Sequence, residues 1–247
     1  EQWGAVEKRL LALKAFLDAR GVKLLVVPVP LKPTVYGERF PGISRKRPST
    51  DGYSHFIGLL NACGMEHIDV RRLLTDNKGR GNVYFKTDMH WSYVAALRVS
   101  QEIVSRANTL MGTNVPWNDA FAPGAQVDFV GGEAASLGVF FPPGEKIVSV
   151  TEQASGGAPC RQTLPHPTFS DYKIFKSGDG CAQELLPKSA LFGNSFMLYC
   201  TGLVDHFTEI HRVLDYSNFQ NLSKIIEKDT KLLICMPFEI EFGYQLL

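Results

Sequence analysis

The sequence lacks long apolar runs and an excess of charge of either sign. No uninterrupted apolar stretch approaches the roughly 20 residues that a membrane-spanning helix needs. The 26 Lys and Arg residues nearly balance the 25 Asp and Glu residues, for a formal net charge of +1. That balance argues against nucleic acid as a partner and against a strongly basic membrane-binding surface. With 247 residues, 45% of them hydrophobic, the chain can bury a full core, and we interpret 1–247 as a single domain.

The sequence contains few cysteines, and their number is odd. Five cysteines leave at least one thiol outside any disulfide. Cys63, Cys200 and Cys235 lie in apolar runs or at a helix end, and we expect them to be small buried side chains. Cys160 and Cys181 flank a loop that contains proline and glycine, where a covalent link would restrict the unfolded chain. We predict a bridge between these two, which would place the protein outside the cytoplasm.

Nucleotide and metal motifs are also lacking. Gly131-Gly132 and Gly178-Asp179-Gly180 lack the strand-glycine-helix spacing of a dinucleotide site. His206 and His211 are five residues apart, which does not match the one-face His-x-x-x-His spacing of zinc proteases. We therefore expect no cofactor and no metal, and we interpret these histidines and the acidic residues beside them as ordinary surface residues.

Hydrophobic periodicity predicts helices that alternate with strands. The helices are expected at 5–20, 53–63, 91–111 and 195–203, and the strands at 24–29, 68–70, 190–192 and 232–236. This alternation indicates an α/β sandwich with a mostly parallel sheet. The first helix should end at Gly21, which can act as a C-terminal cap.

The segment 112–187 interrupts this rhythm. Pairs of glycine and proline separate short β-like pieces such as 146–151 and 172–175. We interpret it as a loop-rich β insertion that folds over the core. It could shape an acceptor groove, or it could be a loop without a functional role.

Two distant segments contain the residue types of an acyl-transfer triad. Asp88 and His90 follow an extended Val-Tyr-Phe segment, and Ser195 lies in a Gly-Asn-Ser turn after a short apolar run. A serine hydroxyl needs an imidazole that accepts its proton and a carboxylate that orients the imidazole. Because active groups of parallel α/β sheets lie at the carboxyl ends of strands, we expect these three side chains to meet there.

Two further residues are candidates for contact with the substrate or an intermediate. Asn194 precedes the serine and could donate a hydrogen bond to an oxyanion, together with backbone N–H groups at a helix start. Trp91 follows His90 and could form a wall of the site or stack on a sugar. Packing against the core is the alternative interpretation of Trp91.

These motifs resemble those of the SGNH-hydrolase-like acetyltransferases of exopolysaccharide modification, a family that includes alginate O-acetylation proteins. The similarity rests on the Lys-Thr-Asp-Met-His-Trp-Ser segment at 86–92, the Gly-x-Ser-Phe at 193–196, and a Pro-x-Lys segment within 26–36. Ordinary SGNH esterases have the serine early and the Asp/His pair last. The order here is reversed, as it is in the acetyltransferase branch through circular permutation. The resemblance implies an SGNH-like three-layer sandwich.

The resemblance also implies roles and a place of action. Ser195 would be the nucleophile, His90 the general base and acid, and Asp88 the group that orients His90. The acceptor would be a hydroxyl of an exopolysaccharide, alginate-like or other, and a membrane acyltransferase would supply the acetyl group. The expected location is periplasmic or extracytoplasmic. Because no export signal begins at Glu1, a membrane tether upstream of this sequence is a further expectation.

The same triad is compatible with two other functions. An acetyl or carbohydrate esterase would transfer the acetyl group to water instead of a sugar. A catalytically silent polysaccharide-binding protein would keep the fold without the chemistry. The sequence leaves all three functions open.

Overall fold

The computed structural model describes residues 2–39, 51–136, 144–152, 161–165, 172–178, 184–214 and 222–242. The expected Cys160–Cys181 bridge lies outside these ranges and stays a prediction. No helix within the described ranges is both long enough and apolar enough to cross a membrane.

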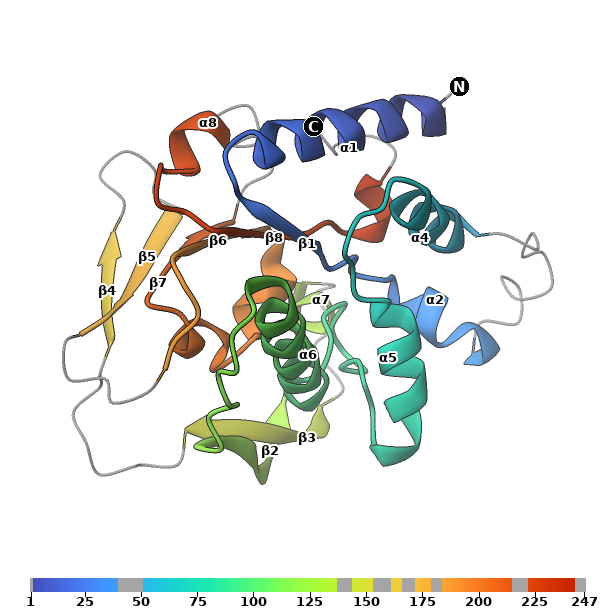
Figure 1. Ribbon diagram of the computed structural model, residues 1–247. Helices are drawn as coiled ribbons and strands as arrows, with labels where there is room; N and C mark the ends of the chain where they lie inside the picture. Colours follow the sequence, from blue (N-terminus) through green and yellow to red (C-terminus); the bar gives the residue numbers. More distant parts are fainter. Residues whose placement is uncertain are drawn as a thin grey trace.

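A six-stranded sheet forms the centre of the protein (Figure 1). Its strands, in spatial order, are β1 (Lys23–Val26), β8 (Leu232–Met236), β6 (Ser189–Gly193), β7 (Glu209–Val213), β5 (Tyr172–Ser177) and β4 (Arg161–Pro165). The first four run parallel, while β5 pairs antiparallel with β7 and β4 antiparallel with β5. The sheet is therefore mostly parallel, as the sequence predicted.

Helices cover both faces of this sheet, which gives three layers (Figure 1). The longer helices are α1 (Gln2–Asp18), α4 (Gly52–Ala62), α5 (Val70–Asn77) and α6 (Tyr93–Met111), and α8 (Leu222–Ile225) is short. Every residue of β6 and β8 is buried. Alternate residues of these strands join two different apolar clusters, one that contains the buried residues of α6 and one that contains the end of α1 with α8. Burial on both faces explains why these strands are almost entirely apolar, with Ser189 at the start of β6 as the exception.

Capping residues fix the start and end of the longest helix. The Ser92 side chain accepts a hydrogen bond from the Ala95 N–H at the start of α6, and Gly112 ends the helix with φ 66°. Serine at the N-cap and a left-handed glycine beyond the last turn are favoured helix ends. The predicted helix at 91–111 is confirmed to within two residues.

Two predicted elements are wrong. In place of the expected strand at 68–70 there is a single parallel bridge between His67 and Val26, beside which the Ile68 N–H donates to the Val26 carbonyl at 3.0 Å. The chain then enters α5 at Val70, where the Asp69 side chain caps the helix by accepting from the Arg72 N–H. The expected helix at 195–203 is replaced by two short 3-10 helices, η3 (Ser195–Tyr199) and η4 (Leu203–His206). Gly202 separates them with φ 82°, and a Cβ atom there would lie 2.5 Å from the Phe121 ring.

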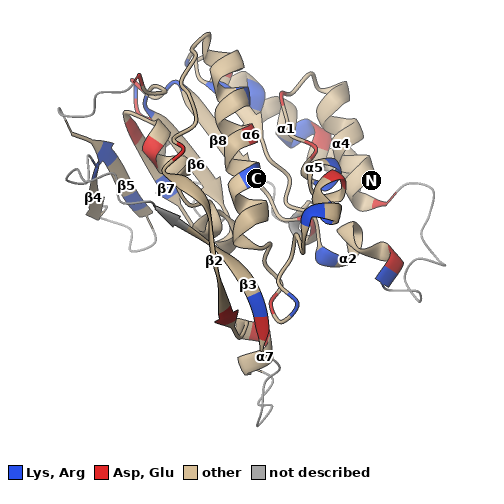
Figure 2. Cartoon of the chain, turned by 90° about the horizontal axis from the view of Figure 1, so that it is seen from below, with Lys and Arg blue, Asp and Glu red and all other residues tan. Residues whose placement is uncertain are grey.

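The segment 112–187 contributes to two sheets. Its strands β2 (Phe121–Phe129) and β3 (Glu145–Glu152) form a separate antiparallel hairpin, which projects from the core in Figure 2. The short helix α7 (Gly132–Ser136) follows β2. In contrast, β4 and β5 extend the main sheet. The segment is therefore more than a cover over the core, although its role as an insertion and its boundaries stay predictions.

The surface interpretation of His206 and His211 is wrong, since they are only 1% and 2% exposed. His206 Nδ1 donates to the Gly202 carbonyl at 2.9 Å, and its Nε2 accepts from the Asn118 N–H at 2.9 Å. His211 Nε2 lies 2.5 Å from a Glu209 carboxylate oxygen, and its Nδ1 contacts the Tyr172 hydroxyl. Each buried ring is thus satisfied at both nitrogens.

His206 makes stability depend on pH. Burial lowers the pKa of His206 from its usual 6.5, so the unfolded chain binds the proton more readily and the free energy of unfolding decreases as the pH falls below about 6.5. The variant His206→Gln removes this contribution. We expect the stability advantage of the wild type over the variant, measured by urea unfolding, to shrink between pH 7 and pH 5. His55→Gln, at an exposed histidine, is the matched control. A constant difference across that range would contradict the assignment.

Candidate active site

The three predicted triad side chains lie together at one end of the sheet. His90 Nε2 is 2.6 Å from Ser195 Oγ, and His90 Nδ1 is 2.6 Å from Asp88 Oδ1. Since the Asp88 carboxylate can only accept, Nδ1 carries the proton and Nε2 is free to accept from the serine hydroxyl. Ser195 begins η3 directly after β6 and Asn194, so it lies at the carboxyl end of a central strand.

Hydrogen bonds hold the Asp88 carboxylate in its charged form. Oδ1 also accepts from the His90 backbone N–H at 2.9 Å, and Oδ2 accepts from the Gly132 N–H at 2.8 Å. Burial alone would raise the pKa of Asp88, but these bonds outweigh it, together with the contact to the His90 ring, and lower the pKa. Asp88 therefore remains available to orient the imidazole and to stabilise its protonated form.

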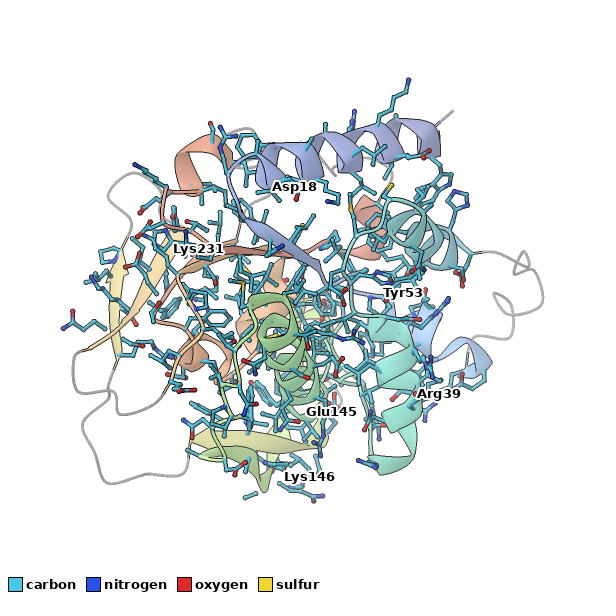
Figure 3. All side chains as sticks on the ribbon, viewed as in Figure 1. Asp18, Arg39, Tyr53, Glu145, Lys146 and Lys231 are labelled. Atoms are coloured by element: carbon cyan, nitrogen blue, oxygen red, sulfur yellow. The ribbon has the colours of Figure 1, made fainter. Side chains whose placement is uncertain are left out.

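Strand β3 and the connection from β2 through α7 hold the backbone on both sides of Asp88. Glu145 Oε1 accepts from both the Thr87 N–H at 2.9 Å and the Thr87 hydroxyl at 2.8 Å. The Gly131 N–H donates to Thr87 Oγ1 at 2.9 Å, and Glu133 accepts from the Met89 N–H at 3.0 Å. Figure 3 shows Glu145 at the end of the hairpin close to α6. Part of the segment 112–187 therefore forms the surroundings of the carboxylate.

Gly131 is required by the closeness of this contact. A Cβ atom at Gly131 would lie 2.2 Å from the Thr87 carbonyl oxygen, which no side chain could tolerate without a backbone shift. The sequence analysis interprets the Gly131-Gly132 pair as a break between short β-like pieces and excludes it as a nucleotide motif, and neither interpretation predicts this contact. The pair was the available signal for this contact, because paired glycines often mark close approach of two backbones.

Lys32, which precedes this loop in the sequence, also binds its backbone. Its Nζ donates to the carbonyls of Phe85 at 2.5 Å, Lys86 at 3.1 Å and Asp88 at 3.1 Å. The three N–H groups of the Lys32 ammonium therefore each have a carbonyl acceptor. Burial lowers the pKa of Lys32, an effect opposed by the negative charges of Glu145, Asp88 and Glu133. In the sequence, the Pro-x-Lys segment contributes only to the family resemblance, and this contact of Lys32 was not predicted.

A carboxylate at the other end of the chain fixes the segment that carries Lys32. Glu239 accepts from the Leu31 N–H at 2.7 Å and from the Thr34 hydroxyl at 2.9 Å. These residues flank Lys32 at the start of the short helix α2 (Lys32–Val35). Glu239 is itself in η6 (Glu239–Glu241), just beyond β8. The lysine is thus supported from the end of a core strand.

The two further candidates, Asn194 and Trp91, have structural contacts. Asn194 accepts from the Phe196 N–H at 3.0 Å and donates to the Met236 carbonyl at 3.1 Å, so both ends of its amide hold the serine turn. Trp91 is fully buried and donates to the Phe196 carbonyl at 3.1 Å. No face of Trp91 is open to a sugar, which favours the packing interpretation. The rings that do pack against His90 are Phe196 and Tyr199, with centroid distances of 4.6 and 4.8 Å.

Two groups of side chains have possible metal ligands within 4.8 Å of one another in the described part of the chain. The first is Asp88, His90 and Glu133, whose atoms are already engaged in the contacts given above. The second is Glu209, His211 and Glu227. There the Lys188 ammonium lies 2.9 Å from Glu209 and also contacts Glu227, so it supplies the balancing positive charge. Neither group needs a metal ion to satisfy it.

Comparison with known proteins places the chain in a family. The family model described as "SGNH hydrolase-like domain, acetyltransferase AlgX" matches residues 2–129, just over half of the chain. The protein belongs to this family. The probable alginate O-acetylase AlgJ of Pseudomonas aeruginosa is 33% identical over 90 residues, which cover 35% of this chain and 22% of that protein. The segment that matches therefore spans only about a fifth of the length of this AlgJ protein.

Solved structures show the same SGNH-like fold. The O-acetyltransferase domain of Pseudomonas putida AlgJ superposes with a TM-score of 0.63 at 17% identity, covering 98% of this chain and 84% of that domain. Bacillus cereus PatB1 gives a TM-score of 0.67 at 12% identity, with coverages of 99% and 92%. At such identities the likeness concerns the fold alone. It confirms the expected SGNH-like sandwich.

Replacing Lys32 tests whether its three hydrogen bonds position the segment that contains Asp88 and His90. We expect Lys32→Met to lower kcat for an acetate ester by about 10- to 100-fold with little change in KM, because a shift of about 1 Å in Asp88 and His90 misaligns the proton transfer. The neighbouring Lys86→Met is the matched control, since the Lys86 side chain is exposed. Thermal unfolding shows whether each variant remains folded. Equal activity of the two folded variants would contradict the positioning role.

Proposed function

We propose that the protein is an O-acetyltransferase that moves an acetyl group through acetyl-Ser195 to a hydroxyl of a polysaccharide. The observation that carries this proposal is the pair of 2.6 Å contacts that link Ser195, His90 and Asp88 in series. This is the arrangement that activates a serine hydroxyl as a nucleophile. The family match supports acetyl transfer as the reaction.

In the first half of the reaction, His90 Nε2 takes the proton of Ser195 Oγ as that oxygen attacks the acetyl carbonyl. The bond to the donor's leaving oxygen then breaks, and His90 returns the proton to that oxygen. The backbone N–H of Ser195, at the start of η3, is the candidate donor to the negatively charged carbonyl oxygen. The products of this half are acetyl-Ser195 and the free donor alcohol.

In the second half, a sugar hydroxyl gives its proton to His90 Nε2 and attacks the acetyl carbonyl. Ser195 Oγ leaves and recovers the proton, which restores the starting enzyme and yields an acetylated sugar. During both halves His90 is transiently positive, and the Asp88 carboxylate stabilises it through Nδ1. The protein requires no cofactor for either step.

The relatives support a polysaccharide acceptor, since AlgJ is named a probable alginate O-acetylase. We extend this to an exopolysaccharide acceptor for this chain, with alginate as the first polymer to test. A membrane acyltransferase as the source of the acetyl group, and a periplasmic or otherwise extracytoplasmic location, belong to the same proposal.

An acetylesterase is the second candidate. The His90 side chain is 14% exposed, so water can approach the base that would activate it. Transfer to water would use the same acetyl-Ser195 intermediate. Mass spectrometry of an oligosaccharide incubated with an acetyl donor separates the two functions. A transferase adds acetyl mass to the oligosaccharide, whereas an esterase releases only acetate.

Ser195→Ala tests the nucleophile. We expect release of acetate from a chromogenic ester to fall by roughly 10⁶-fold in kcat, the effect of removing a serine nucleophile in a triad. Brief incubation of the wild type with the ester should add one acetyl group to the peptide that contains Ser195. Ser105→Ala, at an exposed serine of α6, is the matched control. Full activity of Ser195→Ala would reject the proposed mechanism.

A further inference from the structure

One partly buried arginine of the central sheet has no counter-charge. Among the arginines of the described ranges, three are partly buried and the others are exposed, and the three are Arg71, Arg161 and Arg212. Arg71 pairs with Asp51, and Arg161 pairs with Asp205. Arg212, in β7, forms neither an ion pair nor a hydrogen bond within the described part of the chain. A charged group that is partly removed from water normally has a partner, so the isolation of Arg212 needs an explanation.

The ring of Phe175 lies between Arg212 and a second arginine in the sheet. The guanidinium carbon of Arg212 is 4.8 Å from the centre of this ring, and that of Arg161 is 5.5 Å from it. Burial lowers the pKa of Arg212, and the positive charge of Arg161 acts in the same direction. Contact with an aromatic ring engages the face of a guanidinium group, while the N–H groups around its edge stay able to donate.

The neighbouring strand β5 adds a second positive charge beside Arg212. Lys173 is directly opposite Arg212 in the antiparallel pairing of β5 with β7. Directly opposite residues point to the same face of a sheet, and like charges in such a pair are destabilising. Lys173 is exposed and forms no ion pair with a described acid. Figure 2 shows basic positions on β5 and β7 at this side of the sheet.

The acidic side chains of this region are bound elsewhere. Asp205 contacts Arg161 through Oδ1, and its Oδ2 is buried without a hydrogen-bond partner in the described structure. Glu209 belongs to the same strand as Arg212, but three positions before it, so the two side chains point to opposite faces. On its own face Glu209 lies 2.9 Å from the Lys188 ammonium. Two positive charges therefore stay uncompensated on the face that carries Arg212.

We propose that Arg212 and Lys173 bind the phosphate group of a ligand, on the face of the sheet that packs against α6. A phosphate monoester carries nearly two negative charges at neutral pH, which matches these two cations, whereas one carboxylate would compensate only one of them. The planar guanidinium group presents paired N–H donors to phosphate oxygens, and the ammonium group adds a point charge. None of the described contacts joins either residue to the triad, so phosphate binding here is independent of the proposed acetyl transfer.

Removal of the guanidinium group tests the site directly. We expect sodium phosphate to raise the Tm of the wild type above its value in sodium chloride of equal ionic strength, because a ligand of the native state stabilises it. In calorimetry, Arg212→Gln should weaken phosphate binding about tenfold or more, the effect of losing a charge-assisted hydrogen bond. Arg20→Gln, at an exposed arginine just after α1, is the matched control.

A counter-charge built into the chain provides a second test, which does not depend on the stability of Arg212→Gln. Lys173→Glu replaces the like-charge pair across β5 and β7 by a pair of opposite charges. We expect this variant to have a higher Tm than the wild type in chloride and to lose the additional stabilisation by phosphate. Lys23→Glu, at an exposed lysine of β1 near the opposite edge of the sheet, carries the same charge change and should show neither effect. General salt effects of phosphate act on both variants alike.

Three probes identify the source of the phosphate group: inorganic phosphate, glycerol 3-phosphate, and phosphatidylcholine vesicles that contain phosphatidic acid. Binding of the soluble probes that Arg212→Gln weakens would indicate a soluble phosphate compound. Binding of the vesicles alone, with the same dependence on Arg212, would indicate a lipid headgroup, and either result supports the site. Absence of binding to all three probes, or an equal loss in Arg212→Gln and Arg20→Gln, would overturn the inference. None of these measurements involves acetyl transfer, so they stand apart from the test of Ser195.

Discussion

Asp88 is held by hydrogen bonds from three separate parts of the chain, two to its carboxylate and one to its backbone carbonyl, and the rest of the site depends on this. Its own loop supplies the His90 N–H, the first residue of α7 supplies the Gly132 N–H, and Lys32 fixes the backbone through the Asp88 carbonyl. The short loop around Asp88 cannot keep the Asp88 and His90 side chains aligned by itself, because each residue without an external contact retains backbone freedom. The external contacts remove that freedom before the substrate binds, so it need not be lost in the reaction.

The core strands and the triad could be predicted from sequence because both rest on local information. β6 and β8 are short and almost entirely apolar, and Ser195 lies two residues beyond the end of β6. Asp88 and His90 are two positions apart, so their contact needs no knowledge of the fold beyond an extended loop. Their meeting with Ser195 followed from the rule that strand ends gather at one edge of a parallel sheet.

The residues that support the triad could not be predicted in this way. Lys32 and Glu145 lie 56 and 58 residues from their partners in the Asp88 loop, and nothing in the sequence specifies such pairs. β7 was missed for a related reason. Its sequence, Glu-Ile-His-Arg-Val, is too polar for a buried strand unless His211 finds partners, and these are the neighbouring Glu209 and Tyr172 of the adjacent strand. Such satisfaction of polar groups is visible only in three dimensions.

The β2–β3 hairpin and the residues that follow β2 support the Asp88 loop from a distant part of the chain. Glu145 at the start of β3 accepts from both the N–H and the hydroxyl of Thr87. Gly131 and Gly132, two and three residues after the Phe129 that pairs with Glu145, donate to the Thr87 hydroxyl oxygen and to the Asp88 carboxylate. Because the pairing of Phe129 with Glu145 fixes these groups relative to one another, they restrain the backbone before Asp88 and its side chain as one unit. The segment 112–187 is therefore needed for the geometry of the triad, although it contributes none of its three side chains.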